Sequence, residues 1–431
     1  MRRVLTDELN KQMTAKKRMM ARTGLLLTAM IGVASLTASL PSVAARKSVY
    51  ITVAAGSLDR KESIVSFALP AELRGLFYGL RDESARDLPL IPLQVDAQRR
   101  ATFVLRELLA GRSKTYRVVE TKASQQATAR AELSVDQNQL DLSLAGRKAL
   151  SFVTKPRGAM GAEIKPVFLR GGYIHPVYTP SGRIVTDDYP SDHYHHHGIW
   201  FAWTKTEFEG GHPDFWNVDD GTGRVEFEAL DKTWNGPVHT GFKSRQRYVA
   251  LTGAAPKTAL NEEWEVRLYN VGQGQARYYL FDVVATQRCA TTSPLILDEY
   301  RYGGMGFRGH RDWKDKSKIS FLTSEGKTRV DGNATRARWC HIGGPVDGQQ
   351  VGIAILDHPA NFRAPQPMRL NPDDPFFNYA PSQMGKFEIK PGDEFVLRYR
   401  YVVTDGPPNT SEINRLWADL DNPAQITVAV R

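Results

Sequence analysis

Short runs rich in β-branched and aromatic residues fill most of the chain after residue 48, and they constrain its fold more than any other feature. Each run is bounded by charged residues or by Gly and Pro, which is typical of strands joined by turns. Examples are VYITVAA (49–55), ATFVLREL (101–108), NEEWEVRLYNVG (261–272) and EFVLRYRYVVTDG (394–406). No repeat of fixed period marks a solenoid or propeller. The sequence therefore predicts an all-β protein, built as an antiparallel β-sandwich.

Two local patterns add detail to this prediction. Leucines alternate on both sides of a polar turn in AELSVDQNQLDLSL (131–144), which predicts a β-hairpin. Near the end of the chain, Asn409 offers helix-capping chemistry before four apolar residues at helical spacing. These residues are Ile413, Leu416, Trp417 and Leu420. We expect one short C-terminal helix, docked by this apolar stripe and ended before Pro423.

The first 44 residues have the order of a signal peptide. Basic residues from Lys16 to Arg22 precede the apolar stretch 23–40, and Ser42-Val43-Ala44 then forms a small-x-small cleavage site. The alternative is that the same apolar stretch is retained as an N-terminal anchor. No later stretch is long and apolar enough to cross a membrane. We expect a mature protein that is periplasmic or secreted. This segment also holds half of the formal net charge of +10, so the remainder does not predict nucleic-acid binding.

Gly, Pro and Lys collect at 154–166, where we place a domain boundary. The predicted organisation is a signal peptide (1–44), a small N-terminal β module (45–155), a β-sandwich domain (156–407), and a C-terminal helix and tail (408–431). All ten histidines follow the boundary, so a catalytic function would lie there. Cys289 and Cys340 lack the spacing of a zinc or redox motif, and a disulfide and two free thiols both remain open.

The segment SDHYHHHGIW (191–200) places four histidines within five consecutive positions. If it is extended, His193, His195 and His197 share one face and His196 lies on the other. Such a face suits a metal or a substrate groove, and surface histidines of a polar loop are the plain alternative. Trp200, Trp203 and Trp216 follow closely, and indole faces stack well on sugar rings. At least one of these tryptophans is expected to be a core residue.

Glycines at 304, 306 and 309 match the dinucleotide-binding pattern GxGxxG. No strand–helix context surrounds them, so a nucleotide-binding role is rejected. We expect these glycines to shape a loop that directs Arg308 and His310. The chain also lacks the signatures of a metalloprotease helix, a nucleophile elbow, a P-loop and an EF-hand.

Four motifs in order resemble a bacterial family that carries the automatic label methane oxygenase PmoA and has no established function. They are the segments 173–203, 212–218 (HPDFWNV), 299–309 (EYRYGGMGFRG) and 354–365 (AILDHPANFRAP), and the resemblance covers Lys165 to Gly406. A membrane monooxygenase subunit consists of membrane helices, and this chain offers no candidate span after its leader. The resemblance implies an exported β-sandwich similar to the galactose mutarotase superfold, found among carbohydrate-degrading systems.

The resemblance also implies a set of recurrent residues. They are His175, Asp192, His193, His195, His196, Gly198, Trp200, Asp214, Trp216, Glu299, Arg308, Asp357, His358 and Asn361. The chain departs from the family at His197, where the family usually has Arg, and this puts a role for His197 in doubt.

We therefore expect an exported carbohydrate-active enzyme that cleaves or isomerises a glycan or glycoside by His/carboxylate chemistry. A glycoside hydrolase or polysaccharide lyase is preferred over an epimerase. The expected catalytic residues are His193, His195, His196, Glu299 and Arg308, and the expected substrate-binding residues are His175, Trp200, Asp214, Trp216, Asp357, His358 and Asn361.

Two alternatives stay open: a non-catalytic carbohydrate-binding protein, and a metal-dependent enzyme with histidine ligands. In the second, His193 and His195 would bind a divalent metal, with His175, His358 or a carboxylate as third ligand. No cofactor is the preferred expectation, because neutral imidazoles bind sugar hydroxyls without a metal. A carbohydrate is the expected partner, and the oligomeric state is left open.

Overall fold

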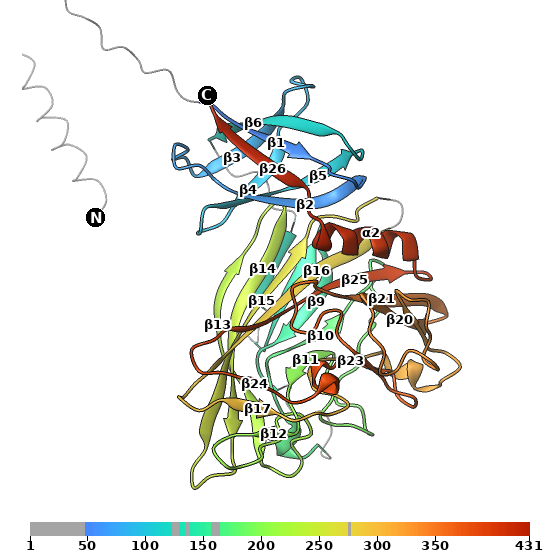
Figure 1. Cartoon of the computed structure of the whole chain (residues 1–431). Coiled ribbons are helices and arrows are strands. Elements are labelled where there is room, and N and C mark those ends of the chain that lie inside the picture. Colours follow the sequence, from blue (N-terminus) through green and yellow to red (C-terminus); the bar gives the residue numbers. More distant parts are fainter. Residues whose placement is uncertain (1–47, 123–128, 134–137, 157–163, 275–276) are drawn as a thin grey trace, which may run out of the picture. The chain divides into compact units, whose positions relative to one another are not determined.

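The computed structural model describes residues 48–122, 129–133, 138–156, 164–274 and 277–431. The predicted signal peptide lies outside these residues. The described strands form four antiparallel sheets (Figure 1), and they confirm the predicted all-β sandwich architecture. Among the described residues, no helix has both the length and the apolar character that a membrane span requires.

The N-terminal residues form a seven-stranded sheet with its own apolar core. Val49, Ile51 and Val53 alternate inward along its strand β1, as expected for a strand with one buried face. In spatial order the strands are β2 (Arg60–Ala68), β5 (Arg100–Leu108), β4 (Ile91–Val95), β3 (Phe77–Asp82), β6 (Ser113–Thr121), β1 (Val49–Ala54) and β26 (Gln425–Val430). Figure 1 shows β26, the last strand of the chain, beside β1. The predicted C-terminal tail therefore contains a strand that the sequence analysis did not anticipate.

Two eight-stranded sheets form the sandwich. The first contains, in spatial order, β22 (Met368–Leu370), β23 (Phe376–Tyr379), β18 (Gly304–Arg308), β11 (Ile199–Ala202), β10 (Tyr173–Val177), β9 (Arg147–Val153), β8 (Gln139–Leu144) and β7 (Ala129–Leu133). The second contains β13 (Gly223–Trp234), β14 (His239–Ala250), β15 (Lys257–Tyr269), β16 (Tyr278–Cys289), β25 (Phe395–Asp405), β21 (Gln349–Asp357), β20 (Trp339–Val346) and β19 (Ser320–Thr323).

Smaller elements connect these sheets. They are a three-stranded sheet of β12 (Thr206–Glu207), β17 (Leu295–Leu297) and β24 (Phe387–Ile389), and the short 3₁₀ helices η2 (Pro166–Phe168), η3 (Arg311–Lys314) and η4 (Pro381–Met384).

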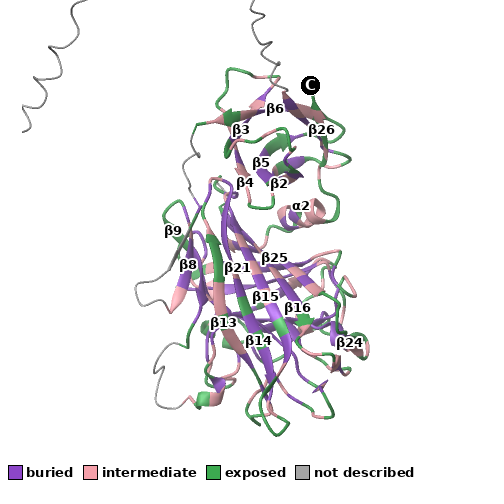
Figure 2. Cartoon of the chain, turned by 90° about the vertical axis from the view of Figure 1, so that its left-hand side faces the viewer, coloured by how far each residue is buried: buried purple, intermediate pink, exposed green. Residues whose placement is uncertain are grey.

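Aromatic side chains from the facing sheets fill the interior of the sandwich. The Trp264 ring of β15 lies 6.0 Å from Phe152 and 5.7 Å from Phe201, both in the opposite sheet. The rings of Tyr379 and Tyr399, which also belong to facing sheets, stack with centroids 5.4 Å apart. Each such fully buried side chain contributes about 1.5–3 kcal/mol through the hydrophobic effect. Figure 2 shows the resulting buried positions along the long strands of the sandwich.

The hairpin predicted over 131–144 is confirmed, because β7 and β8 pair antiparallel with Leu133 opposite Leu140. The predicted module boundary near residue 155 does not coincide with the change of sheet. β9 pairs with β10 through Phe152 and Ile174, so β7, β8 and β9 belong to the sandwich. The change of sheet falls between β6 and β7.

The predicted C-terminal helix is α2 (Thr410–Asp421). The Asn409 side chain caps it by accepting a hydrogen bond from the Glu412 amide (3.1 Å), and Ile413 and Leu416 are buried. Cys289 and Cys340 are both free thiols, and Cys340 is buried.

Candidate functional site: a histidine-lined pocket

The clustered histidines lie in tight turns between β10 and β11, not in a strand. The amide of His193 donates to the Pro190 carbonyl (2.9 Å), and the amide of His196 donates to the His193 carbonyl (2.8 Å). The shared face of His193, His195 and His197 was expected only for an extended segment, and that condition is not met because turns do not alternate side chains as strands do. Instead the rings of His193, His195 and His196 gather together, with centroids 4.6–5.6 Å apart.

Gly198 allows this histidine loop to enter β11 directly. A Cβ atom at this position would clash with the carbonyl oxygen of Ile174 and lie 3.0 Å from the Cβ of His175. Both neighbours belong to β10, which pairs with β11 through Ile174 and Ile199. A residue without a side chain is therefore required here for the two strands to approach each other.

His197 points away from the other three histidines and is buried. Its Nδ1 lies 2.8 Å from the Asp188 carboxylate, which also accepts a hydrogen bond from the Tyr173 hydroxyl (2.8 Å). The His197 ring stacks on Tyr173, with centroids 4.4 Å apart. Burial lowers the pKa of His197, and the bond to Asp188 opposes this shift. These contacts make His197 a packing residue beneath the loop.

The other three histidines open onto a pocket of about 220 Å³. Its wall combines imidazole, indole, phenol, guanidinium and amide groups. The lining residues are His193, His195, His196, Trp216, Asn217, Arg301, Tyr302, Arg369, Asn371 and Phe376.

Aromatic packing supports this pocket from behind. His196 stacks between His193 (centroids 4.7 Å apart) and Phe376 (4.8 Å). Trp200 is fully buried and packs against Trp216 with centroids 4.9 Å apart. Trp200, which we predicted to bind substrate, is thus a core residue beneath the pocket, and Trp216 is the tryptophan that lines it.

Four neighbouring strands of one sheet bring the pocket together. The chain order is β11, β18, β22 and β23, but the spatial order is β22, β23, β18 and β11. The glycines at 304 and 306 lie within strand β18, so the predicted loop at this point is wrong. A Cβ atom on Gly306 would lie 2.8 Å from the rings of both Trp200 and Trp216. Gly306 therefore provides the space in which the two indoles pack.

Asp214 organises the loop that carries Trp216. Its Oδ1 accepts the amide hydrogens of Trp216 and Asn217, both at 2.9 Å. Its Oδ2 accepts from the Asn217 side chain (2.6 Å), while the Tyr302 hydroxyl donates to Asn217 Oδ1 (3.0 Å). Asp214 therefore positions two pocket residues and is not among the residues that line the pocket.

A network of charges lies behind His193. The buried guanidinium of Arg308 donates to Asp192 (3.0 and 3.3 Å) and to Nδ1 of His196 (3.3 Å). The ammonium of Lys314 contacts both Asp192 and Asp374. Arg308 is therefore committed to protein partners and is not among the residues that line the pocket.

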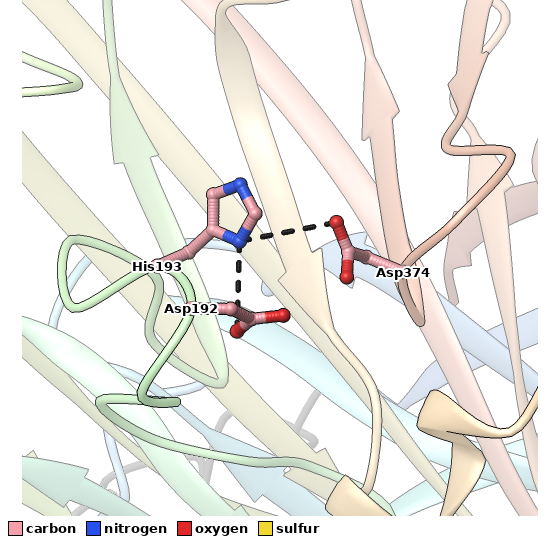
Figure 3. A group of neighbouring side chains, drawn as sticks. All are labelled: Asp192, His193 and Asp374. Atoms are coloured by element: carbon pink, nitrogen blue, oxygen red, sulfur yellow. Dashed lines mark ion pairs between the residues drawn. The ribbon is translucent and has the colours of Figure 1, made fainter.

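Two carboxylates of this network face His193. Nδ1 of His193 lies 3.5 Å from Asp192 and 3.8 Å from Asp374 (Figure 3). In Figure 3 the dashed lines to both carboxylates start from Nδ1, and Nε2 lies on the side of the ring away from Asp192. Nδ1 makes no hydrogen bond to either carboxylate at these distances. A proton on Nδ1 would still face the two acids and leave the lone pair of Nε2 free.

The electrostatic environment keeps three of the pocket side chains uncharged. Burial, with a contribution from the charge of His193, lowers the pKa of His195 to about 4. Burial and the neighbouring His195 hold the pKa of His196 well below its usual range. Burial and the neighbouring Tyr300 raise the pKa of Tyr302 to about 12. At neutral pH, His195 and His196 are therefore uncharged and Tyr302 keeps its proton.

Asp192, one of the two carboxylates that face His193, is held in its charged form. Burial alone would raise the pKa of Asp192, but the hydrogen bond from Lys314 and the charge of Arg308 pull it well below its usual range. Asp192, His193 and Asp374 offer three ligand atoms within 4.8 Å of one another, as a metal site requires. Lys314 already contacts both carboxylates, so a metal ion would have to displace this ammonium group.

Several predicted site residues lie outside the pocket. Glu299 is exposed, in the loop between β17 and β18, and is not among the residues that line the pocket. His175 lies on β10, where Nδ1 is 2.9 Å from the Thr186 hydroxyl. Neither residue therefore meets a substrate held by the three histidines.

The predicted residues Asp357, His358 and Asn361 form a turn after β21, also outside the pocket. Asp357 is buried and accepts hydrogen bonds from the Asn361 side chain and the Gln366 amide, both at 2.7 Å. Nδ1 of His358 accepts from the Ala360 amide (3.1 Å). Burial raises the pKa of Asp357 to about 7, against the opposing effect of these hydrogen bonds. These hydrogen bonds stabilise the turn, and none of its three predicted residues is among those that line the pocket.

The structure also adds residues that sequence reasoning did not select. Arg301 and Tyr302 lie within the segment 299–309. The aromatic and basic residues beside glycines in this segment could have identified both as candidate site residues. Arg369, within β22, and Asn371, just after it, are isolated polar residues, and no sequence motif marked them. Lys314 and Asp374 likewise could be assigned to the site only from their contacts in the structure.

The fold and the pocket together define a two-sheet β-sandwich protein with a histidine- and arginine-lined site on one sheet. Residues 139–418 match a family of unknown function, DUF6807, and the chain belongs to this family. No curated protein matches the sequence.

Solved structures with a similar arrangement include an alpha-mannosidase from Enterococcus faecalis V583 (9% identity, TM-score 0.42) and a protein in glycosyl hydrolase family 38 from Enterococcus faecalis (9%, 0.40). Both alignments cover 90% of this chain, and they cover 46% and 48% of those proteins. Heparan sulfate lyase HepC from Pedobacter heparinus aligns over 67% of this chain and 38% of its own (10%, TM-score 0.31). The chain thus spans half or less of the length of these structures.

Proposed function

We propose that this protein is an exported carbohydrate-active enzyme whose active site is the histidine pocket. The observation that carries the proposal is the arrangement around His193. One ring nitrogen, Nδ1, lies near two carboxylates, and the ring lines a pocket that His193 shares with Trp216 and Tyr302. A histidine so oriented is suited to accept a proton from a bound substrate.

The other pocket groups suit a sugar ring. The Trp216 indole, which is 2% exposed, contributes apolar surface to the pocket wall, and neutral imidazoles can both donate to and accept from hydroxyl groups. The pocket volume of about 220 Å³ is below the roughly 300–1,000 Å³ of pockets for larger ligands. We therefore assign to it a single sugar residue of a glycan or glycoside.

His195 and His196 have supporting roles in this proposal. Nδ1 of His196 accepts from Arg308, so the proton of its neutral ring lies on Nε2. His195 stays uncharged because burial lowers its pKa. Both rings thus supply hydrogen bonds, and His193 supplies the proton acceptor.

A non-catalytic carbohydrate-binding protein is the second candidate. It is favoured by the aromatic and amide groups of the pocket, which bind sugars without chemistry. The metal-dependent alternative is less suited to this chain because Lys314 contacts the two carboxylates that would hold the ion.

We further propose that the sandwich is a variant of the galactose mutarotase superfold, and that residues 1–44 direct export. N-terminal sequencing of the protein from the periplasmic or secreted fraction should begin near Ala45. Recovery of the intact leader in the membrane fraction would instead support an anchor.

Turnover of a panel of glycans and aryl glycosides by the wild type and by His193→Ala tests the enzymatic proposal. We expect His193→Ala to lower kcat by about 10²–10⁴-fold while binding remains, because only the proton transfer is removed. His212→Ala is the matched control, since His212 is an exposed histidine outside the pocket. Binding of sugars without turnover by the wild type would favour the second candidate.

A further inference from the structure

We propose that the histidine pocket takes an acidic sugar, a uronate residue of a polysaccharide, and breaks its glycosidic bond by β-elimination. This deepens the proposed function and rests on it. The geometry that points to an acidic sugar is a pair of arginines, Arg301 and Arg369, that line the pocket together with His193 and Tyr302.

Among the ion pairs of the described residues, none includes Arg301 or Arg369. Arg301 lies over the rings of Tyr300 and Tyr302, at 5.7 and 5.6 Å from their centroids. Arg369 donates only to a neutral group, the Asn333 side chain (3.2 Å). Arg308, by contrast, forms an ion pair with Asp192.

The two guanidinium groups also act on each other. Arg369 is partly buried and Arg301 is exposed. Burial, followed by the charge of Arg301, lowers the pKa of Arg369, and the charge of Asp373 opposes this shift. A carboxylate placed between them would relieve this repulsion and accept charge-assisted hydrogen bonds. Guanidinium groups match the planar geometry of a carboxylate, which makes a uronate a better fit than a neutral sugar.

The same pocket contains the acid and base that elimination needs. The guanidinium groups would stabilise the negative charge that develops on the uronate carboxylate when the C5 proton leaves. Nε2 of His193 would accept that proton, and the C5–H electron pair would form the C4=C5 double bond. The C4–O bond then breaks, and its oxygen would take the proton of the Tyr302 hydroxyl.

This step balances without water or any other co-reactant. His193 gains one proton and Tyr302 loses one, and exchange with solvent restores both groups. Tyr302 is protonated beforehand because its pKa is raised to about 12. Glycoside hydrolysis usually requires two carboxyl groups beside the scissile bond, and none of the ten residues described as lining the pocket is Asp or Glu.

Calorimetric binding of monosaccharides tests the acidic specificity directly. Glucuronate and galacturonate are compared with glucose and galactose, using the wild type, Arg301→Gln and Arg369→Gln. We expect the wild type to prefer the uronates and each variant to lose roughly 10- to 100-fold in uronate affinity. Arg106→Gln is the matched control, since this exposed arginine lies on β5 and is not among the residues that line the pocket.

The reaction is tested with polysaccharides of galacturonate, glucuronate and mannuronate–guluronate, beside neutral mannan and aryl glycosides. Elimination gives an unsaturated uronate that absorbs in the ultraviolet, and its products lack the water that hydrolysis adds. We expect this absorbance with a uronate polymer, and its loss in His193→Ala and Tyr302→Phe with unfolding temperatures unchanged.

The outcomes separate the two proposals. Hydrolysis of a neutral glycan, or equal binding of neutral sugars and uronates, would overturn the acidic specificity while leaving a carbohydrate-active enzyme. Uronate binding without turnover of any polymer would overturn elimination and favour a binding protein. Absence of both sugar binding and turnover would overturn the proposed function itself.

Discussion

Replacing Arg308 by Met should destabilise the protein strongly, because its guanidinium is the buried cation of the charge network. The Arg308 side chain is 2% exposed, and it lies 3.0 Å from Asp192 and 3.9 Å from Asp374. At 3.0 Å, two unit charges attract each other by about 5–6 kcal/mol at an effective dielectric constant of about 20. Desolvation of both ions offsets part of this attraction, so a net loss of about 3–5 kcal/mol is typical when one partner of a buried pair is removed.

Two features of the structure place Arg308→Met at the lower end of this range. Asp192 is 30% exposed, so water compensates part of its lost partner, and Lys314 still contacts both carboxylates. We therefore expect a loss of about 3 kcal/mol in the free energy of unfolding. Denaturant unfolding monitored by tryptophan fluorescence measures this value.

Lys314→Met is the matched control for Arg308→Met. The Lys314 side chain is 52% exposed, and pairs at such positions are worth about 0–1 kcal/mol. A loss below about 1 kcal/mol in Arg308→Met, or a larger loss in Lys314→Met, would refute the assignment of Arg308 as the buried cation that holds the network.

Three further predictions follow from the pocket. Gly306→Ala should shift the tryptophan fluorescence and cost about 1–3 kcal/mol of stability, because the new Cβ would lie 2.8 Å from both indoles. Gly253→Ala is the control, since its Cβ would make only an ordinary 3.7 Å contact. Equal effects of the two substitutions would contradict the role of Gly306. Stability should fall as the pH drops from about 6.5 to about 4, because His195, with a folded-state pKa of about 4, stays unprotonated while the unfolded chain takes up a proton. His195→Gln should make this slope shallower and His212→Gln should not, as measured by unfolding at several pH values, and an unchanged slope in His195→Gln would contradict the reasoning. Treatment with a chelator should leave turnover unchanged, because Lys314 contacts Asp192 and Asp374 in the place where a metal ion would bind. Near-stoichiometric metal in tag-free protein, together with loss of activity in the chelator, would refute this prediction.

Local sequence patterns predicted much of the fold because they depend on neighbouring residues. Alternation of leucines specified the hairpin of β7 and β8, and Asn409 with the apolar stripe specified α2. The boundary near residue 155 failed because the loop composition at 154–166 does not report which sheet β9 joins. Likewise, β26 pairs with β1 across almost the whole chain, a contact that no local pattern encodes.

The residues of the candidate site likewise fall into those that the sequence could identify and those that only the structure revealed. The histidine run and Trp216 could be selected from the sequence because reactive and aromatic residues concentrate there. Their orientation could not be predicted, since the run is a turn that gathers His193, His195 and His196 and buries His197 against Asp188. Arg369 in β22 has no motif of its own.

The sequence by itself thus determined the all-β class, the terminal helix and the segment that holds the histidines, because periodicity, capping and residue chemistry act over a few residues. Only the tertiary structure decided which polar groups share a pocket. It brought Arg301, Tyr302 and Arg369 to the histidines and left Glu299 and Asp357 outside. The physical reason is that strands distant in sequence become neighbours through backbone pairing, as β22, β23, β18 and β11 do here, and side-chain proximity follows from that pairing.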